Sequence, residues 1–186
     1  MAMPSVFVLG YSEAAMLLAG QTDVRIRALI AICGQREFAV EHPRITNRLI
    51  LHFDDIDAMD DADPIQASAW RMRQRERADL GLIQTPPTLD DARQIIAFAE
   101  TIRGMEGALL CHCLGGISRS AAAALLVMAR WTGPGLEAEC MRQLRLIRPC
   151  ASPHRDLVRF GDSLLNRSGR LVSAAIEQLQ LPEDSI

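Results

Sequence analysis

The 186-residue sequence contains no lysine, and all of its 20 basic residues are arginine. With 23 acidic residues the net charge at pH 7 is −3. A chain that is slightly acidic overall has no general attraction to nucleic acid or to an anionic membrane surface. The absence of lysine fits the codon bias of a GC-rich genome, and we attach no function to it.

The sequence also lacks any run of about 20 apolar residues, the length that a transmembrane helix requires. Its first residues, Met1-Ala2-Met3-Pro4, lack the charged start of a signal peptide. We therefore expect a cytoplasmic protein with no membrane partner. Because 49% of the residues are hydrophobic, the chain can bury one sizeable core. We predict a single domain over residues 1–186, in which residues 166–186 form a C-terminal helical extension.

The sequence has five cysteines but no C-x-x-C motif. An odd number without such pairs argues against a disulfide framework. Cys111-His112-Cys113 could be read as metal ligands, but strand alternation places His112 on the opposite face from both cysteines. No second ligand pair of zinc spacing lies elsewhere in the sequence. We expect no metal and no cofactor.

Apolar strands alternate with amphipathic helices along the chain, which predicts an α/β fold. We expect a three-layer sandwich with a central, mostly parallel sheet flanked by helices. Ser12 is a candidate cap for the first helix, and Thr88 with Asp91 has the spacing of a capping box. Strands are expected at 6–10, 27–34, 48–54 and 108–111, and helices at 12–18, 88–104, 121–130, 136–147 and after Pro153.

The most informative stretch is His112-Cys113-Leu114-Gly115-Gly116-Ile117-Ser118-Arg119-Ser120. It follows an apolar strand and precedes an alanine-rich helix, so it forms a tight glycine-containing loop at a helix N-terminus. Successive N–H groups of such a loop bind an oxyanion together with the positive end of the helix. We predict a phosphate-binding loop, or P-loop, of Leu114, Gly115, Gly116, Ile117, Ser118 and Arg119.

Reactive side chains stand at both ends of this loop. Cys113 attacks only as a thiolate, a form that a helix N-terminus and a fixed cation favour. The planar guanidinium of Arg119 stays charged and can bind two phosphoryl oxygens at once. The Ser120 hydroxyl can donate to the sulfur, and His112, on the other side of the strand, is expected to brace the loop from behind.

These residues resemble the H-C-x5-R-S/T signature of the cysteine-dependent protein tyrosine phosphatases, and the ending G-x-S-R-S most resembles the small, dual-specificity-like branch. By element order the resemblance extends over about residues 5–165. It implies a tyrosine-phosphatase-like fold and a phosphatase that hydrolyses phosphomonoesters through a phosphocysteine intermediate at Cys113, without a metal. The implied partner is a phosphorylated protein, phosphotyrosine first, or a small phosphomonoester.

The resemblance also implies a general acid, an aspartate on a loop after an earlier strand. Here an apolar strand runs directly into acidic residues. In the dual-specificity pattern that the sequence resembles, the acid follows an inward apolar strand residue by two positions. If Leu51 and Phe53 face the core, alternation puts Asp55 in that place. Asp54 is the runner-up and Asp57 the third choice. The competing interpretation is that these aspartates form a solvated acidic turn.

Two more features have open roles. Residues 60–87 are the least regular part and contain four arginines at alternate positions from Arg71 to Arg77. These arginines belong either to a solvated helix or loop, or to a segment that attracts an acidic peptide or a second phosphate. His154, after Pro153, stands where a polar residue supports the loop in similar phosphatases.

Two alternative functions stay open. Rhodanese-like sulfurtransferases have similar loops, although the acidic residues 54–57 have no role there. A non-enzymatic phosphate-binding module is the second alternative, and the complete set of Cys113, Arg119 and Ser120 argues against it. The absence of lysine from the loop makes highly charged phosphoinositides the less favoured substrates. No oligomeric state follows from the sequence.

Overall fold

A computed structural model of the chain describes residues 5–20, 24–57 and 64–180. Its centre is a four-stranded sheet in the order β1-β4-β2-β3, and every pair of neighbours is parallel. The predictions of a mostly parallel sheet and of its four strands are confirmed. The strands are β1 (Ser5–Gly10), β2 (Ile26–Cys33), β3 (Asn47–His52) and β4 (Ala108–Cys113).

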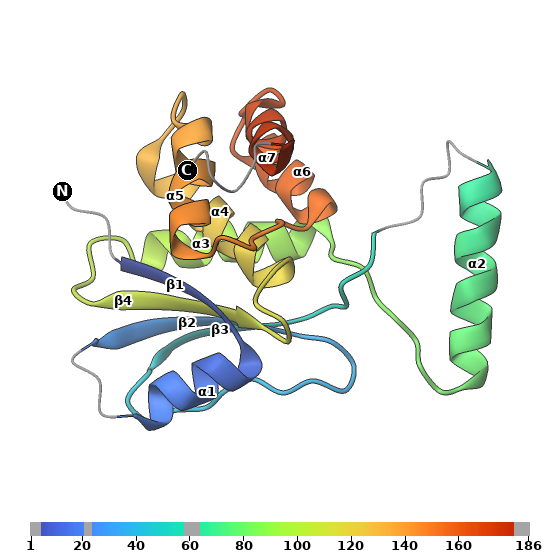
Figure 1. Cartoon of the computed structure of the whole chain (residues 1–186), viewed down its shortest axis with the longest axis horizontal. Helices are drawn as coiled ribbons and strands as arrows, with labels where there is room; N and C mark the ends of the chain where they lie inside the picture. The colour runs from blue at the N-terminus through green and yellow to red at the C-terminus, as the bar shows by residue number, and fades with distance from the viewer. Residues whose placement is uncertain (1–4, 21–23, 58–63, 181–186) are drawn as a thin grey trace.

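Helices cover both faces of the sheet, as the predicted three-layer sandwich requires (Figure 1). One face carries α1, and the opposite face carries the layer formed by α3, α4, α5 and α6 (Figure 1). The C-terminal helix α7 packs on α5 and α6. The helices are α1 (Tyr11–Ala19), α2 (Pro64–Asp79), α3 (Leu89–Thr101), α4 (Arg119–Thr132), α5 (Glu137–Ile147), α6 (Arg155–Leu164) and α7 (Arg170–Gln180).

Helix α4 is the buried centre of the helical layer. Its four consecutive alanines, 121–124, are fully buried and leave little side-chain bulk around the helix. This allows close packing against α3, α5, α6 and the sheet. At its far end the indole N–H of Trp131 donates to the carbonyl of Ala99 in α3, at 2.9 Å. The helix that starts at the predicted loop is therefore held on several sides.

Two helix starts differ in how well the sequence predicted them. The capping box of α3 is confirmed, because Thr88 Oγ1 accepts from Asp91 N–H at 3.3 Å and Asp91 Oδ2 accepts from Thr88 N–H at 2.7 Å. The proposed Ser12 cap is wrong, because α1 begins directly at the end of β1 with Gly10 as its N-cap. The Glu13 carboxylate accepts the Gly10 N–H at 2.7 Å instead.

The irregular segment predicted at 60–87 contains helix α2, whereas its residues 60–63 lie outside the described part. Helix α2 stands beside the sandwich and is not part of either helical layer (Figure 1). The predicted C-terminal helical extension corresponds to α7, and residues 181–186 lie outside the described part. Among the described residues, no helix has both the length and the apolar character that crossing a membrane requires.

Candidate active site

The loop that joins β4 to α4 lies at the carboxyl edge of the parallel sheet, where α/β proteins bind their ligands. Cys113 ends β4 and is paired with Gly10, which ends β1. Gly116 has a φ of +69°, and a Cβ there would collide with the backbone of Leu9 and Gly10. Only glycine fits this position, because it tolerates positive φ and needs no space for a side chain.

The backbone carbonyls of this loop are bound from outside. Tyr11 N–H donates to Leu114 O at 3.0 Å, and Ser152 N–H donates to Ile117 O at 2.9 Å. Ser118 O accepts from His154 N–H at 3.3 Å. When successive carbonyls are held on the outer side, the N–H groups of the loop are left for its concave side.

Arg148 holds two more of these carbonyls and was not identified from the sequence. Its Nε donates to Gly116 O at 3.1 Å and its Nη2 donates to Gly115 O at 3.2 Å. Its Nη1 donates to Glu13 at 2.9 Å, and Glu13 also accepts the Gly10 N–H. The hydrogen bond from Arg148 keeps the pKa of Glu13 below its usual value. One ion pair thus ties the loop to the end of β1.

Cys113 is buried at the start of the loop, with only 2% of the residue exposed. Gly116 N–H donates to Sγ at 3.3 Å, and the Ser120 hydroxyl lies 3.2 Å from it. The Cys113 sulfur therefore has polar neighbours from the loop and from the start of α4. Cys111, by contrast, is buried in the core, and this burial raises its pKa far above the usual value. The two neighbouring thiols therefore have opposite environments.

Arg119 is buried, and most of its donors are already used. Nη1 donates to Glu37 at 2.8 Å and to Phe53 O at 3.1 Å, and Nη2 donates to Glu37 at 3.0 Å. Its buried Nε has no hydrogen-bond partner among the described residues. A guanidinium has five N–H groups, so Nε and one hydrogen of Nη2 remain along the same edge. That edge has the geometry to bind two oxygens of one anion.

Glu37 was also missed by the sequence analysis. Burial by itself would raise its pKa, but the hydrogen bonds from Arg119 and from Gly34 N–H outweigh burial and lower it. The same pair raises the pKa of Arg119 despite the burial of the guanidinium. Glu37 follows β2, a strand that the sequence identified, but the 82 residues between the partners leave no local signal for the pairing.

The candidate acids Asp54 and Asp55 point to different partners. Leu51 and Phe53 face the core, as predicted. The Asp54 carboxylate accepts from the N–H of Thr85 at 2.9 Å and anchors its own loop. Asp55 Oδ1 accepts from the Ser118 hydroxyl at 2.6 Å and is in contact with the phosphate-binding loop.

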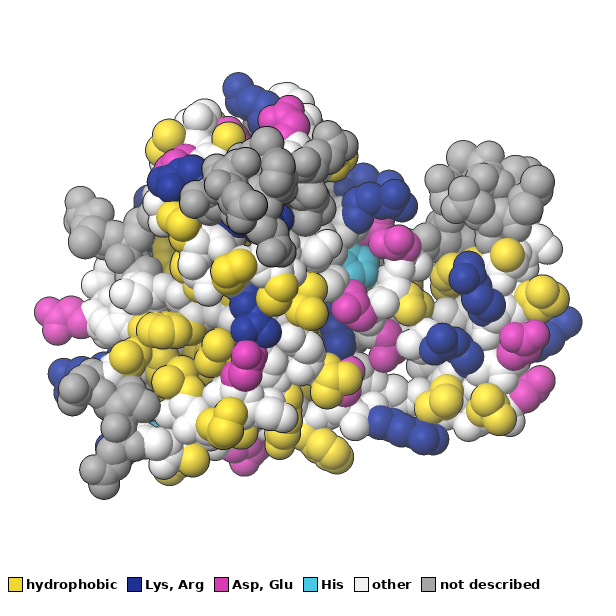
Figure 2. Space-filling model, in the orientation of Figure 1, with side chains coloured by type: hydrophobic (Ala, Val, Ile, Leu, Met, Phe, Trp, Pro, Cys, Tyr) yellow, Lys and Arg dark blue, Asp and Glu magenta, His cyan; other side chains and the backbone are white. Residues whose placement is uncertain are grey.

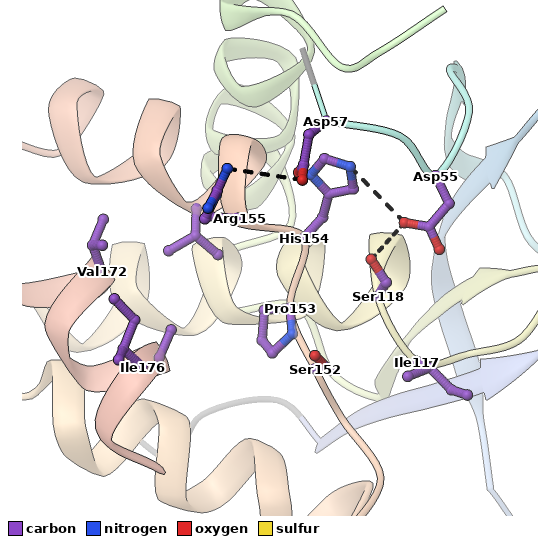
Figure 3. Close-up of a pocket in the computed structure, with 12 residues that line it drawn as sticks. Asp55, Asp57, Ile117, Ser118, Ser152, Pro153, His154, Arg155, Val172 and Ile176 are labelled. Carbon is purple, nitrogen blue, oxygen red and sulfur yellow. Dashed lines mark hydrogen bonds and ion pairs between the residues drawn. The ribbon is translucent and has the colours of Figure 1, made fainter. Parts of the chain in front are cut away.

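Asp57, the third candidate, is turned toward α6. Its carboxylate lies 3.8 Å from Arg155 Nη2, and both side chains are more than half exposed. Figure 3 shows this pair apart from the Asp55–Ser118 contact. Of the three candidates, the fold therefore brings Asp55 to the loop.

The two histidines singled out by the sequence support the loop from different sides. His112 lies on the face of β4 opposite Cys113, where its Nε2 accepts from Val40 N–H at 3.1 Å and its ring meets Tyr11 edge-on. Burial lowers the pKa of His112. His154 is 3.1 Å from Ile56 O and 3.9 Å from Asp55, so it lies between the acidic segment and the loop.

A cavity of about 400 Å³ opens beside Asp55 and Ser118 (Figure 3). Its opposite wall is apolar and comes from Val172, Ala175 and Ile176 of α7. The cavity has room for an organic group attached to an anion in the loop. No cluster of three or more histidine, cysteine or carboxylate side chains suited to a metal occurs within residues 5–20, 24–57 and 64–180.

No protein-family model matches the sequence, and no curated protein matches it significantly. Solved structures do match. Human DUSP28 is 22% identical with a TM-score of 0.53, covering 95% of this chain and 94% of its own. The Yvh1 phosphatase domain from Chaetomium thermophilum is 20% identical with a TM-score of 0.53, covering 91% and 99%. Tk-PTP in its active form is 14% identical with a TM-score of 0.54, covering 90% and 94%. The chain has the fold of the dual-specificity phosphatases.

Proposed function

We propose that this protein is a phosphatase that hydrolyses phosphomonoesters through a phosphocysteine intermediate at Cys113, with phosphotyrosine as the first candidate substrate. The observation that carries the proposal is the 2.6 Å hydrogen bond between Ser118 and Asp55. It joins a carboxyl group that can carry a proton to the loop that holds the thiol. Nucleophile and acid thus meet at one anion-binding loop, which is what ester hydrolysis needs.

In the first step the Cys113 thiolate attacks phosphorus. An S–P bond forms and the P–O bond to the leaving alcohol or phenol breaks. Asp55 gives its proton to the leaving oxygen, so that no alkoxide or phenoxide is released. The free edge of Arg119 and the loop N–H groups bind the other phosphoryl oxygens. The organic part of the substrate occupies the cavity beside Asp55.

In the second step water attacks the phosphocysteine. Asp55, now a carboxylate, takes a proton from the water, the P–O bond forms and the S–P bond breaks. The hydroxyl of Ser120, 3.2 Å from the sulfur, stabilises the departing thiolate by donating to it. Phosphate leaves with both the thiolate and the protonated acid restored.

The same geometry favours a phosphatase over the two alternatives. A sulfurtransferase of the rhodanese type has no use for a carboxyl group hydrogen-bonded to its loop. A module that only binds phosphate needs no nucleophile. Here the Cys113 sulfur accepts a hydrogen bond from Gly116 N–H and lies 3.2 Å from the Ser120 hydroxyl, and in this proposal it faces the phosphorus of a bound ester.

Turnover of para-nitrophenyl phosphate by the wild type and by Cys113→Ser tests the proposal. We expect phosphate release by the wild type and a loss of about 10⁴-fold or more in the variant, as for removal of other catalytic nucleophiles. Equal inactivity with retained binding of a phosphotyrosine peptide would establish the binding module. Thiosulfate turnover without phosphate release would establish the sulfurtransferase.

A further inference from the structure

A second cavity, of about 230 Å³, lies between helix α2 and the acidic segment. From α2 it is lined by Trp70, Arg73, Gln74 and Arg77, and opposite them by Ile56, Asp57 and Gln84. Two arginines and two amides give it many hydrogen-bond donors. Nothing in the proposed reaction uses this cavity.

The four arginines of α2 divide into two pairs. Arg73 and Arg77 are four residues apart, one helical turn, and both line the cavity. Arg71 and Arg75 are also one turn apart, but neither lines it. Figure 2 shows separate basic side chains over the part of the surface that α2 occupies in Figure 1. The sequence, in which all four arginines stand at equal spacing, could not separate these pairs.

The cavity arginines are not ion-paired within the described part of the chain. Neither Arg73 nor Arg77 forms an ion pair with a described side chain. The one carboxylate in the lining, Asp57, lies against Arg155 of α6 instead (Figure 3). Two guanidinium groups in one concave site, neither of them ion-paired with a described side chain, favour an external anion.

The cavity is close to the reacting end of the substrate. The indole N–H of Trp70 donates to Asp57 O at 3.2 Å and fixes α2 to the acidic segment. Asp57 is two residues from Asp55, a separation of at most about 8 Å along the backbone. An extended peptide advances about 3.3 Å per residue. A peptide whose phosphorylated residue is in the loop can therefore present a side chain two to four positions away to Arg73 and Arg77.

We propose that Arg73 and Arg77 form a second recognition site that binds acidic side chains of a phosphopeptide near its phosphorylated residue. This proposal rests on the proposed phosphatase function and assigns its substrate class, acidic phosphopeptides. The arginines act on substrate affinity and take no part in the chemical step. Their contribution is electrostatic and partly solvent-exposed, so it weakens as salt screens the charges.

The test compares two phosphotyrosine peptides, one with glutamates two to four residues from the phosphotyrosine on both sides and one with glutamines there. KM is measured for the wild type, for Arg73→Gln/Arg77→Gln and for Arg71→Gln/Arg75→Gln. The last variant removes the same charge from the same helix. We expect the wild type to prefer the acidic peptide, and the cavity variant to raise its KM about fivefold or more. The control is expected to change KM less than twofold.

Two further measurements separate the possible failures. Arg73→Lys/Arg77→Lys keeps the charge and should keep much of the preference, so an equal loss in the lysine and glutamine variants would refute charge recognition. Fluorescence anisotropy with each variant in a Cys113→Ser background measures peptide affinity without catalysis. If para-nitrophenyl phosphate is not hydrolysed, the proposed function fails while the anisotropy comparison still decides this proposal. Equal effects of the two arginine pairs would overturn it.

Discussion

The phosphate-binding loop and the acidic segment 54–57 face each other across the site but are held in different ways. The carbonyls of residues 114–118 all receive hydrogen bonds from elsewhere in the fold. In the acidic segment, Asp54 binds Thr85 through both its carboxylate and its backbone N–H, and the carbonyls of Ile56 and Asp57 contact His154 and Trp70. The Asp55 side chain is 47% exposed, whereas Cys113 is 2% exposed.

The loop and the acidic segment therefore suit different roles in the same site. Binding an anion through backbone dipoles requires that the dipoles be oriented before the ligand arrives, because reorientation during the reaction would cost free energy. A general acid needs only to reach the leaving oxygen, which differs from one substrate to another. A rigid loop and a more exposed acid therefore suit one active site. Substitutions in the loop and in the acidic segment should therefore have different effects.

The largest effect is expected from the acid side. Asp55→Asn removes the proton donor, and we expect kcat for an ester with a poor leaving group to fall about 10²–10⁴-fold. Hydrolysis of an ester with a good leaving group should fall much less. Asp54→Asn is the matched control, since it lowers the stability of the segment but leaves the donor. If Asp54→Asn alone produced the leaving-group dependence, Asp55 would not be the acid.

On the loop side, Arg148→Met should lower kcat/KM by up to about 10²-fold, the effect of misplacing reacting groups by about 1 Å. The variant releases the carbonyls of Gly115 and Gly116, so their peptide units lose their orientation. Arg142→Met in α5, the helix that ends directly before Arg148, should have little effect, because Arg142 is hydrogen-bonded to Glu139 of the same helix. Vanadate affinity measures the loop directly, and unchanged affinity in Arg148→Met would contradict its role.

Glu37→Gln should weaken the orientation of Arg119 and lower the free energy of unfolding by about 1–3 kcal/mol. Because the folded-state pKa of Glu37 is lowered, its stabilisation is present above the ordinary value of 4.5 and is lost as the pH falls through the folded-state value. The difference between wild type and variant should therefore shrink in acid. Urea unfolding at neutral pH and near pH 3 measures the difference in free energy of unfolding between wild type and variant. A difference that is the same at both pH values would show that the stabilisation does not come from the ionised Glu37 carboxylate.

The smallest effect is expected from the exposed pair Arg155–Asp57. Its atoms are 3.8 Å apart and its side chains are 73% and 56% exposed. Surface pairs of this kind contribute about 0–1 kcal/mol. Arg155→Gln should lower the free energy of unfolding by less than about 0.5 kcal/mol. A larger loss in thermal unfolding would show that the acidic segment depends on α6 more than its contacts indicate.

The phosphate-binding loop was easier to predict from the sequence than the distant residues that hold it in place. The strand, loop and start of α4 were predicted because the signal lies in contiguous residues whose backbone is fixed locally. Glu37 and Arg148 were missed because each acts on a residue far away in the chain, Arg119 and Gly116 respectively. An arginine before a proline or a glutamate after a buried strand has no distinctive local pattern. The Ser12 cap failed because the strand leads into α1 without an intervening turn.

The sequence by itself determined the strands of the sheet, the helices other than α2, and the phosphate-binding loop with its thiol and its cation. These features depend on periodicity, helix propensity and glycine, which are properties of neighbouring residues. Only the tertiary structure decided which aspartate meets the loop, since Ser118 and Asp55 are 63 residues apart. It also decided which edge of Arg119 Glu37 occupies and which arginines of α2 share a cavity. Side chains from distant segments become neighbours only when the core packs, and no local pattern records that packing.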